Sequence, residues 1–238
     1  MLACFRARDQ GLSNQALAVR CGLPKSTVSR LTYTLTRLGY LEHDPDSGLY
    51  RLGSATLSLG STVLSRMDVR HRARPLMQRL ADETQTMVSL GARDRLNMIY
   101  VENCRSQAAL KLTLDVGSRL PLATTAMGRA YLLACPDAVR DDLLQRLREA
   151  HPGLDVDACL AAAQDDERRN GVCCSFGDWL PDVNAIAIAF QPHGSRTLVS
   201  LNCGGPAAHL SREYLLERVR PRLMAVVRAL QAPPEVAG

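Results

Sequence analysis

A group of polar side chains near the N-terminus has the chemistry that contacts nucleic acid. The group lies on a segment whose apolar residues are spaced as in a helix, and it consists of Lys25, Ser26, Thr27, Ser29, Arg30 and Tyr33. Cations and hydroxyls pair with phosphates, and the same groups hydrogen-bond to base edges in the major groove. An ordinary solvated helix face has a similar composition, so the surrounding elements must decide between the two.

The residues around this group have the spacing of a helix-turn-helix. Leu17 and Ala18 form the apolar-then-small pair that is needed where two helices nearly touch. Gly22 is the residue type that adopts a left-handed turn without strain. Val28 and Leu31 are expected to pack back from the second helix. The spacing therefore predicts that the second helix presents its polar group to DNA.

A β-hairpin is predicted directly after these helices. Residues 40–52 contain two short apolar segments around Asp46-Ser47-Gly48, residue types that are typical of hairpin turns. A hairpin after a recognition helix is a wing. Arg51 in this hairpin is placed to reach a phosphate or the minor groove, although it can also serve only to cap the hairpin.

The positive charge of the chain is concentrated in the same part. The formal net charge is +5, and residues 1–66 hold eight Arg or Lys against four Asp or Glu, whereas residues 67–238 hold 21 against 20. A basic surface attracts phosphate, which favours DNA as a partner. A chance bias on a solvated surface gives the same pattern, so the charge supports the motif without replacing it.

Length and composition favour globular domains. The chain has 238 residues, of which 46% are hydrophobic, enough for two domains or one large one. No apolar run approaches the roughly 18 residues of a membrane span, and no signal peptide is recognisable, so we expect a cytoplasmic protein without a membrane partner. The eight cysteines lack a compact spacing and are predicted to be buried thiols, with no disulfide framework and no metal site.

The pattern beyond residue 52 predicts a linker helix and an α+β domain. A helix is expected over residues 53–66 and another over 69–83, where Pro75 should cause a kink or a break. Strands are predicted at 86–92, 97–102, 109–115, 184–190 and 198–203, and helices at 124–134, 137–148, 158–170 and 211–230. The simplest architecture is an antiparallel sheet flanked by helices. We therefore divide the chain into residues 1–52, 53–67 and 68–238.

Several separate motifs occur in a family-specific order. They are Gly22-Leu-Pro-Lys-Ser-Thr-Val-Ser-Arg-Leu31, Tyr50-Arg-Leu-Gly53, Gly117-Ser-Arg-Leu-Pro-Leu122, Thr125-Ala-Met-Gly128, Asn184-Ala-Ile-Ala187 and Gly205-Pro206. On these motifs the chain resembles the IclR family of bacterial transcription regulators. The resemblance implies a winged helix-turn-helix followed by a GAF-like effector-binding domain, in a homodimer or tetramer on operator DNA. Family members usually have a longer first helix, and this chain begins partway through it.

The resemblance also places ten residues around an effector pocket. They are Leu112, Leu120, Ala126, Met127, Cys174, Asp182, Asn184, Ile186, Asn202 and Gly204. The free amides at the helix start near Ala126 suit a carboxylate, and the two asparagines supply neutral hydrogen-bonding groups. The expected effector is a small organic acid, and aromatic acids are included in this class. Taken singly, the three aliphatic residues fit a core role equally well. Trp179 packs either over the mouth of the pocket or in the core.

The function predicted from these observations is a ligand-responsive regulator of a metabolic operon, with a catabolic one favoured. Two other classes of protein are alternatives: an enzyme that carries a winged helix as an interaction module, and an oligomerisation scaffold. The chain has no Gly-x-Ser-x-Gly elbow, P-loop, Gly-x-Gly-x-x-Gly or His-Glu-x-x-His motif, and its five histidines are scattered. No catalytic residue, cofactor or metal ligand is therefore predicted.

Overall fold

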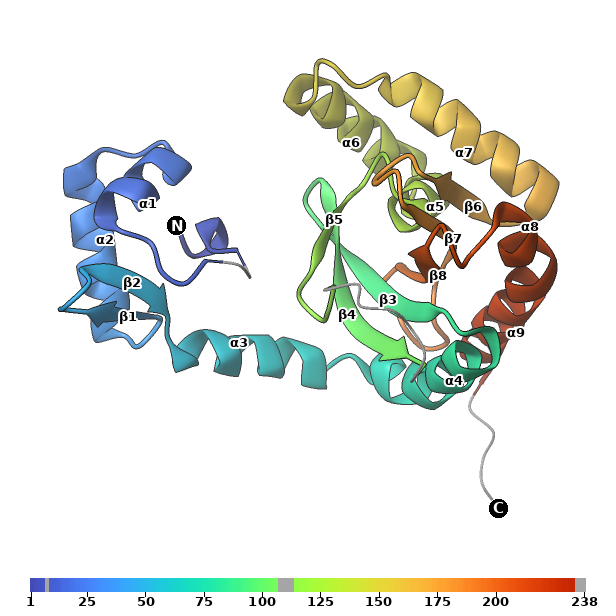
Figure 1. Cartoon of the computed structure of the whole chain (residues 1–238), viewed down its shortest axis with the longest axis horizontal. Coiled ribbons are helices and arrows are strands. Elements are labelled where there is room, and N and C mark those ends of the chain that lie inside the picture. Colours follow the sequence, from blue (N-terminus) through green and yellow to red (C-terminus); the bar gives the residue numbers. More distant parts are fainter. Residues whose placement is uncertain (7–8, 107–113, 234–238) are drawn as a thin grey trace. The chain divides into compact units, whose positions relative to one another are not determined.

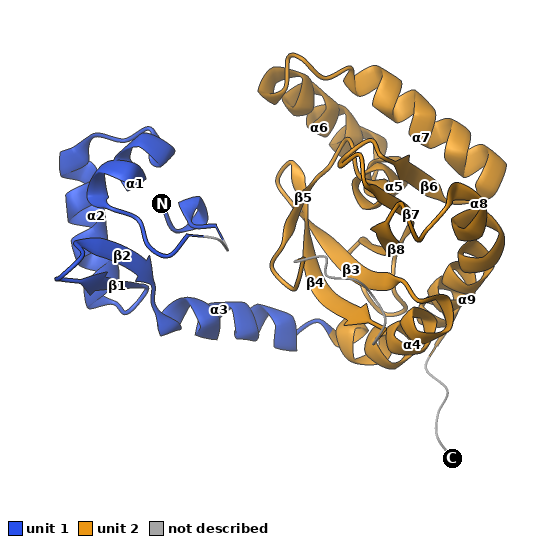
Figure 2. Cartoon of the chain, viewed as in Figure 1, with its two compact units in different colours: residues 1–67 blue, residues 68–238 orange. Residues whose placement is uncertain are grey.

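The computed structural model describes residues 1–6, 9–106 and 114–233 of the chain (Figure 1). It divides into two compact units, Met1–Met67 and Asp68–Gly238, which Figure 2 shows in different colours. Within the described residues, no helix has both the length and the apolar character needed to cross a membrane.

The first unit contains the predicted helix-turn-helix. Helix α1 (Asn14–Cys21) begins where the Ser13 hydroxyl accepts a hydrogen bond from the amide of Ala16 at 3.1 Å, a standard N-cap. Gly22 then adopts φ +63°, the left-handed conformation that ends α1. Helix α2 (Lys25–Arg37) follows, and a short 3₁₀ helix, η1 (Leu2–Cys4), precedes α1.

The packing between α1 and α2 differs from the prediction at one residue. Leu17, Ala18 and Val28 are buried as expected, whereas Leu31 is 39% exposed. Thr32 is fully buried in its place. Residues four apart in a helix share a face, so Thr32 lies on the same face as Val28. The prediction for Leu31 was wrong by one position on the helix surface.

The wing and the linker helix complete this unit. Strands β1 (Leu41–Asp44) and β2 (Leu49–Leu52) form an antiparallel hairpin, and Gly48 in its turn has φ +65°. Leu12 extends the hairpin by pairing with Tyr50. Helix α3 (Ser54–Ser65) follows, and none of its residues is buried.

The second unit is built on a six-stranded antiparallel sheet. Its strand order is β5 (Arg119–Pro121), β4 (Asn97–Arg105), β3 (Met87–Asp94), β8 (Val199–Pro206), β7 (Val183–Phe190) and β6 (Cys173–Phe176). The short edge strands β5 and β6 were not predicted. Most of the strand expected at 109–115 lies outside the described residues, and residues 114 and 115 are not in a strand.

Helices cover the sheet, which confirms the predicted α+β class. They are α4 (Asp68–Thr84), α5 (Ala126–Ala134), α6 (Asp137–Ala150), α7 (Val156–Asn170), α8 (Arg212–Tyr214), the π-helical turn η2 (Leu215–Val219) and α9 (Arg220–Gln231). Helix α4 packs against β3, β4 and α9, whereas α5 packs against β6, β7 and β8.

Helix α4 continues through Pro75, so the predicted break does not occur. Pro75 is exposed, and the carbonyl that its missing N–H would have bonded can be hydrated there. Ala73 and Met77 are fully buried on either side of it. Their packing holds both halves of the helix on the sheet.

The cysteines are not all buried, in contrast to the prediction. Five of them are buried in the second unit: Cys104, Cys135, Cys173, Cys174 and Cys203. Cys4, Cys21 and Cys159 are half-buried. Burial raises the pKa of the Cys174 thiol to about 12, with a further contribution from Asp166, so this thiol is protonated at neutral pH.

Candidate functional site

The polar group on α2 lies at the surface, as a DNA-contacting helix requires. All six of its residues are exposed: Lys25, Ser26, Thr27, Ser29, Arg30 and Tyr33. Only the Ser29 hydroxyl is engaged by another side chain among the described residues, since it accepts a hydrogen bond from Asn14 Nδ2 at 2.9 Å. Helix α2 has no acidic residue in its first turn, so its cations face no carboxylate on their own helix.

The hairpin arginine has local partners. Arg51 Nε donates to the carbonyl of Gln10 at 2.9 Å, and its guanidinium lies 3.6 Å from the Asp44 carboxylate. The Asp44 pKa is lowered, chiefly by a hydrogen bond from Ser47 and then by the amide of Asp46. Arg51 therefore ties the wing to the chain before α1, while its side chain stays 55% exposed.

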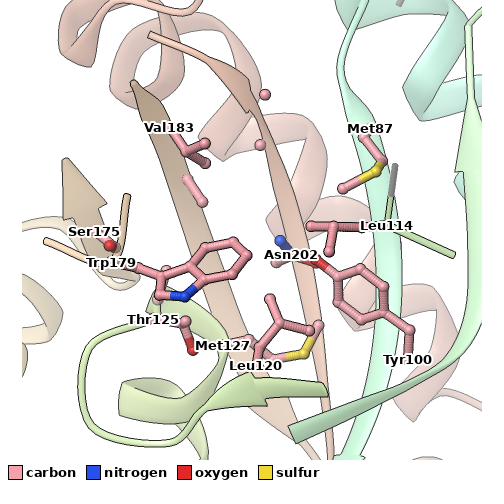
Figure 3. Close-up of a pocket in the computed structure, with 14 residues that line it drawn as sticks. Met87, Tyr100, Leu114, Leu120, Thr125, Met127, Ser175, Trp179, Val183 and Asn202 are labelled. Carbon is pink, nitrogen blue, oxygen red and sulfur yellow. The ribbon is translucent and has the colours of Figure 1, made fainter. Parts of the chain in front are cut away.

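A pocket in the second unit lies between the sheet, the start of α5 and the segment between β6 and β7 (Figure 3). The space free of atoms among its lining residues amounts to about 390 Å³, a figure that includes open solvent. Its lining residues are Met87, Tyr100, Leu114, Leu120, Thr125, Ala126, Met127, Ser175, Trp179, Val183, Ala185, Asn202, Gly204 and Gly205. None of these described lining residues carries a charged side chain.

One end of the pocket is polar. Figure 3 shows Tyr100 and Asn202 directed toward each other from β4 and β8. Burial raises the pKa of the Tyr100 hydroxyl, and hydrogen bonding with Ser89 and Asn202 lowers it in part, so the phenol is neutral at physiological pH. Asn202 Oδ1 is buried without a hydrogen-bond partner among the described residues. A ligand donor placed there would satisfy it.

The other polar feature is the N-terminus of α5. Thr125 is the N-cap: its hydroxyl accepts from the amide of Gly128 at 3.2 Å and donates to the carbonyl of Pro121 at 2.7 Å. The first-turn residues Ala126 and Met127 line the pocket. The positive end of a helix dipole and its first amides favour an anion. In a pocket without charged side chains, these amides are the groups that suit a carboxylate.

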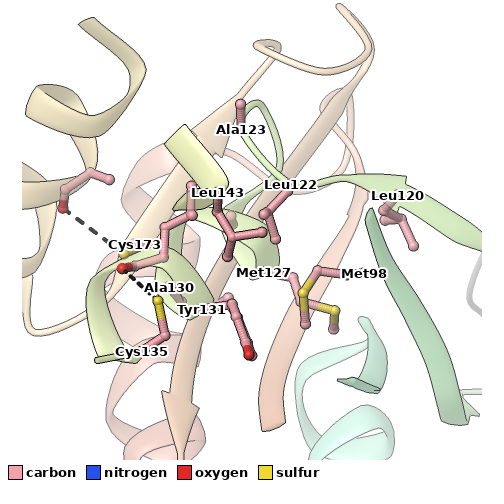
Figure 4. Close-up of a cluster of buried hydrophobic side chains, with 14 of the residues drawn as sticks. Met98, Leu120, Leu122, Ala123, Met127, Ala130, Tyr131, Cys135, Leu143 and Cys173 are labelled. Carbon is pink, nitrogen blue, oxygen red and sulfur yellow. Dashed lines mark hydrogen bonds between the residues drawn. The ribbon is translucent and has the colours of Figure 1, made fainter. Parts of the chain in front are cut away.

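The apolar wall of the pocket continues into the core. Leu120 and Met127 belong both to the lining and to the buried cluster drawn in Figure 4, which also contains Met98 and Leu122. Gly91 allows this packing, because a Cβ on it would lie 2.2 Å from Met127 Sδ. The pocket-facing side of α5 is therefore fixed by core packing.

A buried arginine fixes the segment that carries Trp179. Arg129 Nη1 donates to the carbonyl of Cys174 at 2.8 Å and to Asp178 Oδ2 at 2.7 Å, and its Nε donates to the carbonyl of Ala123 at 3.1 Å. Its side chain is only 7% exposed. Trp179, which follows Asp178, is half-buried, lines the pocket and also packs against the core cluster.

The structure brings together half of the predicted effector residues. Those that line the pocket are Leu120, Ala126, Met127, Asn202 and Gly204. Leu112 lies outside the described residues. The other four do not line the pocket: Cys174, Asp182, Asn184 and Ile186.

Strand alternation explains most of this difference. Successive side chains in a strand point to opposite faces of the sheet, and Val183 and Ala185 of β7 line the pocket. Asn184 and Ile186 therefore point to the other face, where Asn184 Nδ2 donates to the carbonyl of Leu210 at 2.8 Å. Asp182 lies before the strand and is exposed.

The same alternation displaces Cys174 and reveals residues that the sequence analysis missed. Ser175, rather than Cys174, lines the pocket on β6. Met87 and Tyr100 come from predicted strands but were not assigned to the site. Met87 pairs with Gly204 in the sheet, and paired residues share a face. This register is visible only in the structure, so the sequence alone carried no signal for Met87.

A helix-turn-helix unit followed by an antiparallel-sheet domain is an architecture typical of bacterial transcription regulators. Family models agree: the IclR helix-turn-helix domain matches residues 1–45, and the bacterial transcriptional regulator IclR C-terminal domain matches residues 61–232. The chain belongs to the IclR family of bacterial transcriptional regulators. The family and the matched relatives are transcriptional regulators, which argues against the enzyme alternative.

Individual relatives support this assignment. The HTH-type transcriptional regulator TsaQ1/TsaQ2 of Comamonas testosteroni is 34% identical over all of this chain and 86% of its own length. An IclR family regulator from Brucella abortus is 40% identical, with a TM-score of 0.88 over 98% of this chain and 89% of its own. An IclR homolog from Microbacterium hydrocarbonoxydans, complexed with 4-hydroxybenzoate, shares the fold at 21% identity and a TM-score of 0.69, over 96% of each chain.

Proposed function

We propose that this protein is a ligand-responsive regulator of a metabolic operon, in which α2 and the wing bind operator DNA and the pocket of the second unit binds a small organic acid. The observation that carries the proposal is the pocket itself. Its apolar walls lie between the N-terminus of α5 and the Tyr100–Asn202 pair. In a chain that also has a helix-turn-helix, a ligand bound in this pocket supplies the signal that regulates DNA binding.

The proposed DNA contacts are the six exposed residues of α2 together with Arg51. Arg30 is exposed, and no hydrogen bond or ion pair engages its guanidinium among the described residues. If it reads a base, Arg30→Ala should weaken binding by about 1–3 kcal/mol and change base preference. If it contacts phosphate only, affinity should fall evenly across sequences, with a shallower salt dependence.

The test is fluorescence anisotropy with DNA from the intergenic region next to this gene, at several salt concentrations. The double variant Ser26→Ala, Arg30→Ala should bind much more weakly than the wild type. Arg146→Ala, on the exposed surface of α6 in the second unit, is the matched control and should bind normally. Unchanged affinity of the double variant would reject α2 as the contact.

The proposed effector is an organic acid with an aromatic ring and a second polar group. Its carboxylate would meet the amides of Ala126 and Met127, and its ring would lie among apolar side chains that include Leu120. A hydroxyl opposite the carboxylate would reach Tyr100 and Asn202. 4-Hydroxybenzoate, the ligand of the Microbacterium homolog, has these two groups at opposite ends of one ring.

A thermal-shift screen of carboxylic acids tests this proposal. An acid present at 100 times its Kd should stabilise the protein by about 2.7 kcal/mol, which corresponds to roughly 5–10 °C for a unit of this size. Tyr100→Phe should weaken binding of hydroxylated acids more than of unsubstituted ones. The proposal is wrong if neutral or cationic metabolites raise the melting temperature while no acid does.

We also infer that the protein is a homodimer or tetramer. Helix α3 has no buried residue in the single chain, and Leu57, Leu59 and Val63 on it are 72%, 54% and 62% exposed. Such exposed apolar residues mark an interaction surface. The particle mass from sedimentation equilibrium should be a multiple of the 26.0 kDa chain mass. The double variant Leu57→Glu, Val63→Glu should have a smaller particle mass than the wild type. A monomeric wild type would reject the inference.

A further inference from the structure

Two cysteine thiols meet in the DNA-binding unit. Cys4 is the last residue of η1 and Cys21 is the last residue of α1, and their Sγ atoms lie 3.1 Å apart. Both are half-buried, whereas the five buried cysteines lie in the second unit. The pair is therefore close together and accessible to a small reagent.

The backbone around the pair is already fastened in place. Arg20 Nη1 donates to the carbonyl of Cys4 at 2.9 Å, and the Arg20 guanidinium also binds the Asp9 carboxylate at 2.6 and 3.0 Å. Cys4 packs against the core of this unit, and Gly22 ends α1 directly after Cys21. A disulfide requires sulfurs about 2.05 Å apart, so only a shift of about 1 Å separates the two thiols from bonding.

We propose that Cys4 and Cys21 form a reversible disulfide, made by exchange with a low-molecular-weight disulfide, that fastens η1 to α1 in the DNA-binding unit. The thiolate of one cysteine attacks a sulfur of the reagent, breaks its S–S bond and releases one small thiol. The second cysteine thiolate then attacks the protein-bound sulfur and expels the second small thiol. The two protein thiols lose two electrons and two protons. The reagent takes up these electrons and protons and is thereby reduced to two small thiols.

The surroundings of Cys4 set the pH at which this exchange runs. Burial raises the pKa of the Cys4 thiol, and its hydrogen bond with Cys21 raises it further, while the nearby N-terminus and Arg20 lower it in part. The thiolate is the attacking species. Disulfide formation is therefore faster at pH 9 than at pH 7.

The disulfide stabilises this unit because it joins residues 17 positions apart. Closing a loop of that length removes freedom from the unfolded chain, and the thermal midpoint of the DNA-binding unit should rise by roughly 10–20 °C. Helix α2 contributes no atom to the pair. The exposed polar residues of α2 therefore keep their places in both redox states.

Mass spectrometry of the full chain tests the proposal. The reduced protein is incubated with oxidised glutathione and then denatured in the presence of an alkylating reagent, which caps every free thiol. The protein is then digested with trypsin. We expect the peptides of residues 1–6 and 21–25 to be joined, the other six cysteines to be alkylated, and dithiothreitol to reverse the change. Melting curves of the oxidised and reduced protein then measure the shift of the first unit.

Variants give the controls. Cys4→Ser and Cys21→Ser should each retain a single glutathione in place of the disulfide and lose the shift in melting temperature. Cys159→Ser, which removes the half-buried thiol of the second unit, should form the disulfide normally. If all eight thiols of the wild type are alkylated after oxidation, if a different pair is joined, or if the joined pair leaves the melting temperature unchanged, the proposal is overturned.

Discussion

Replacing Arg129 with methionine should loosen the segment that carries Trp179 while keeping the apolar stem of the side chain. The guanidinium donates to two backbone carbonyls, those of Ala123 and Cys174, and to the Asp178 carboxylate. Methionine keeps a similar length and packs in the same space but donates no hydrogen bond. Three acceptors would lose a partner at once.

The magnitude follows from how buried each acceptor is. Asp178 is 43% exposed, so water can replace the arginine there and the loss is small. The carbonyl of Cys174 lies in a buried strand segment, and an acceptor left unsatisfied in such a place costs about 1–3 kcal/mol. With the Ala123 carbonyl included, Arg129→Met should destabilise the second unit by about 2–4 kcal/mol. The thermal midpoint should fall by roughly 5–15 °C.

The assay combines urea unfolding with fluorescence of Trp179, the single tryptophan. Emission of the folded variant should shift to longer wavelength because the segment after Asp178 is no longer tied to α5. Arg146→Met is the matched control: its partner Asp142 is exposed, so its unfolding midpoint and emission should stay close to those of the wild type. An Arg129→Met protein with wild-type midpoint and emission would refute the role assigned to this arginine.

Two further changes test close packing and charge. Gly128→Ala should destabilise the second unit by about 1–3 kcal/mol, because the added Cβ would lie 2.1 Å from the carbonyl oxygen of Leu122. Thermal melting measures the loss. Gly153→Ala is the control and should be near neutral, because a Cβ there meets no atom within 4 Å. The pKa of Asp9 is lowered to about 2, chiefly by its hydrogen bond with Arg20. A lowered carboxylate pKa stabilises the folded state above the unfolded value of about 4 and ceases to do so as pH falls through about 2. The first unit should therefore melt higher in the wild type than in Asp9→Asn at pH 6, and melting curves at stepped pH should show the difference vanish between pH 4 and 2; a difference independent of pH would contradict it.

The helix-turn-helix could be predicted from the sequence because its signals are local. Ser13 caps α1 and Gly22 ends it with φ +63°, and both roles depend on residues within a few positions in the chain. The error at Leu31 has the same origin, since a spacing pattern fixes a helix face only to within one residue. Thr32 can occupy the buried position because its hydroxyl donates to the carbonyl of Ser29 at 3.1 Å and is therefore not left unpaired.

The pocket could be predicted only in part because both faces of its strands are apolar. Along this part of β7, the side chains on the two faces differ in size rather than in polarity. The small residues Ala185 and Ala187 face α5, and the larger Ile186 faces away from it. Hydrophobic patterning identifies the buried face only where the other face is polar. The sequence alone therefore specified the strand but left open which of its two faces forms the pocket.

The small residues Ala185 and Ala187 of β7 face α5, and other close contacts of α5 link the parts of the site. Three consecutive residues of α5 have separate partners: Met127 fills the space left by Gly91, Gly128 touches the backbone of Leu122, and Arg129 holds the segment before Trp179. Close-packed interiors deform little. A ligand that displaces Met127 must therefore shift the start of α5 as a body, and that motion would also change the hold on Trp179. The first turn of α5 thus couples the apolar lining of the pocket to the segment that carries Trp179.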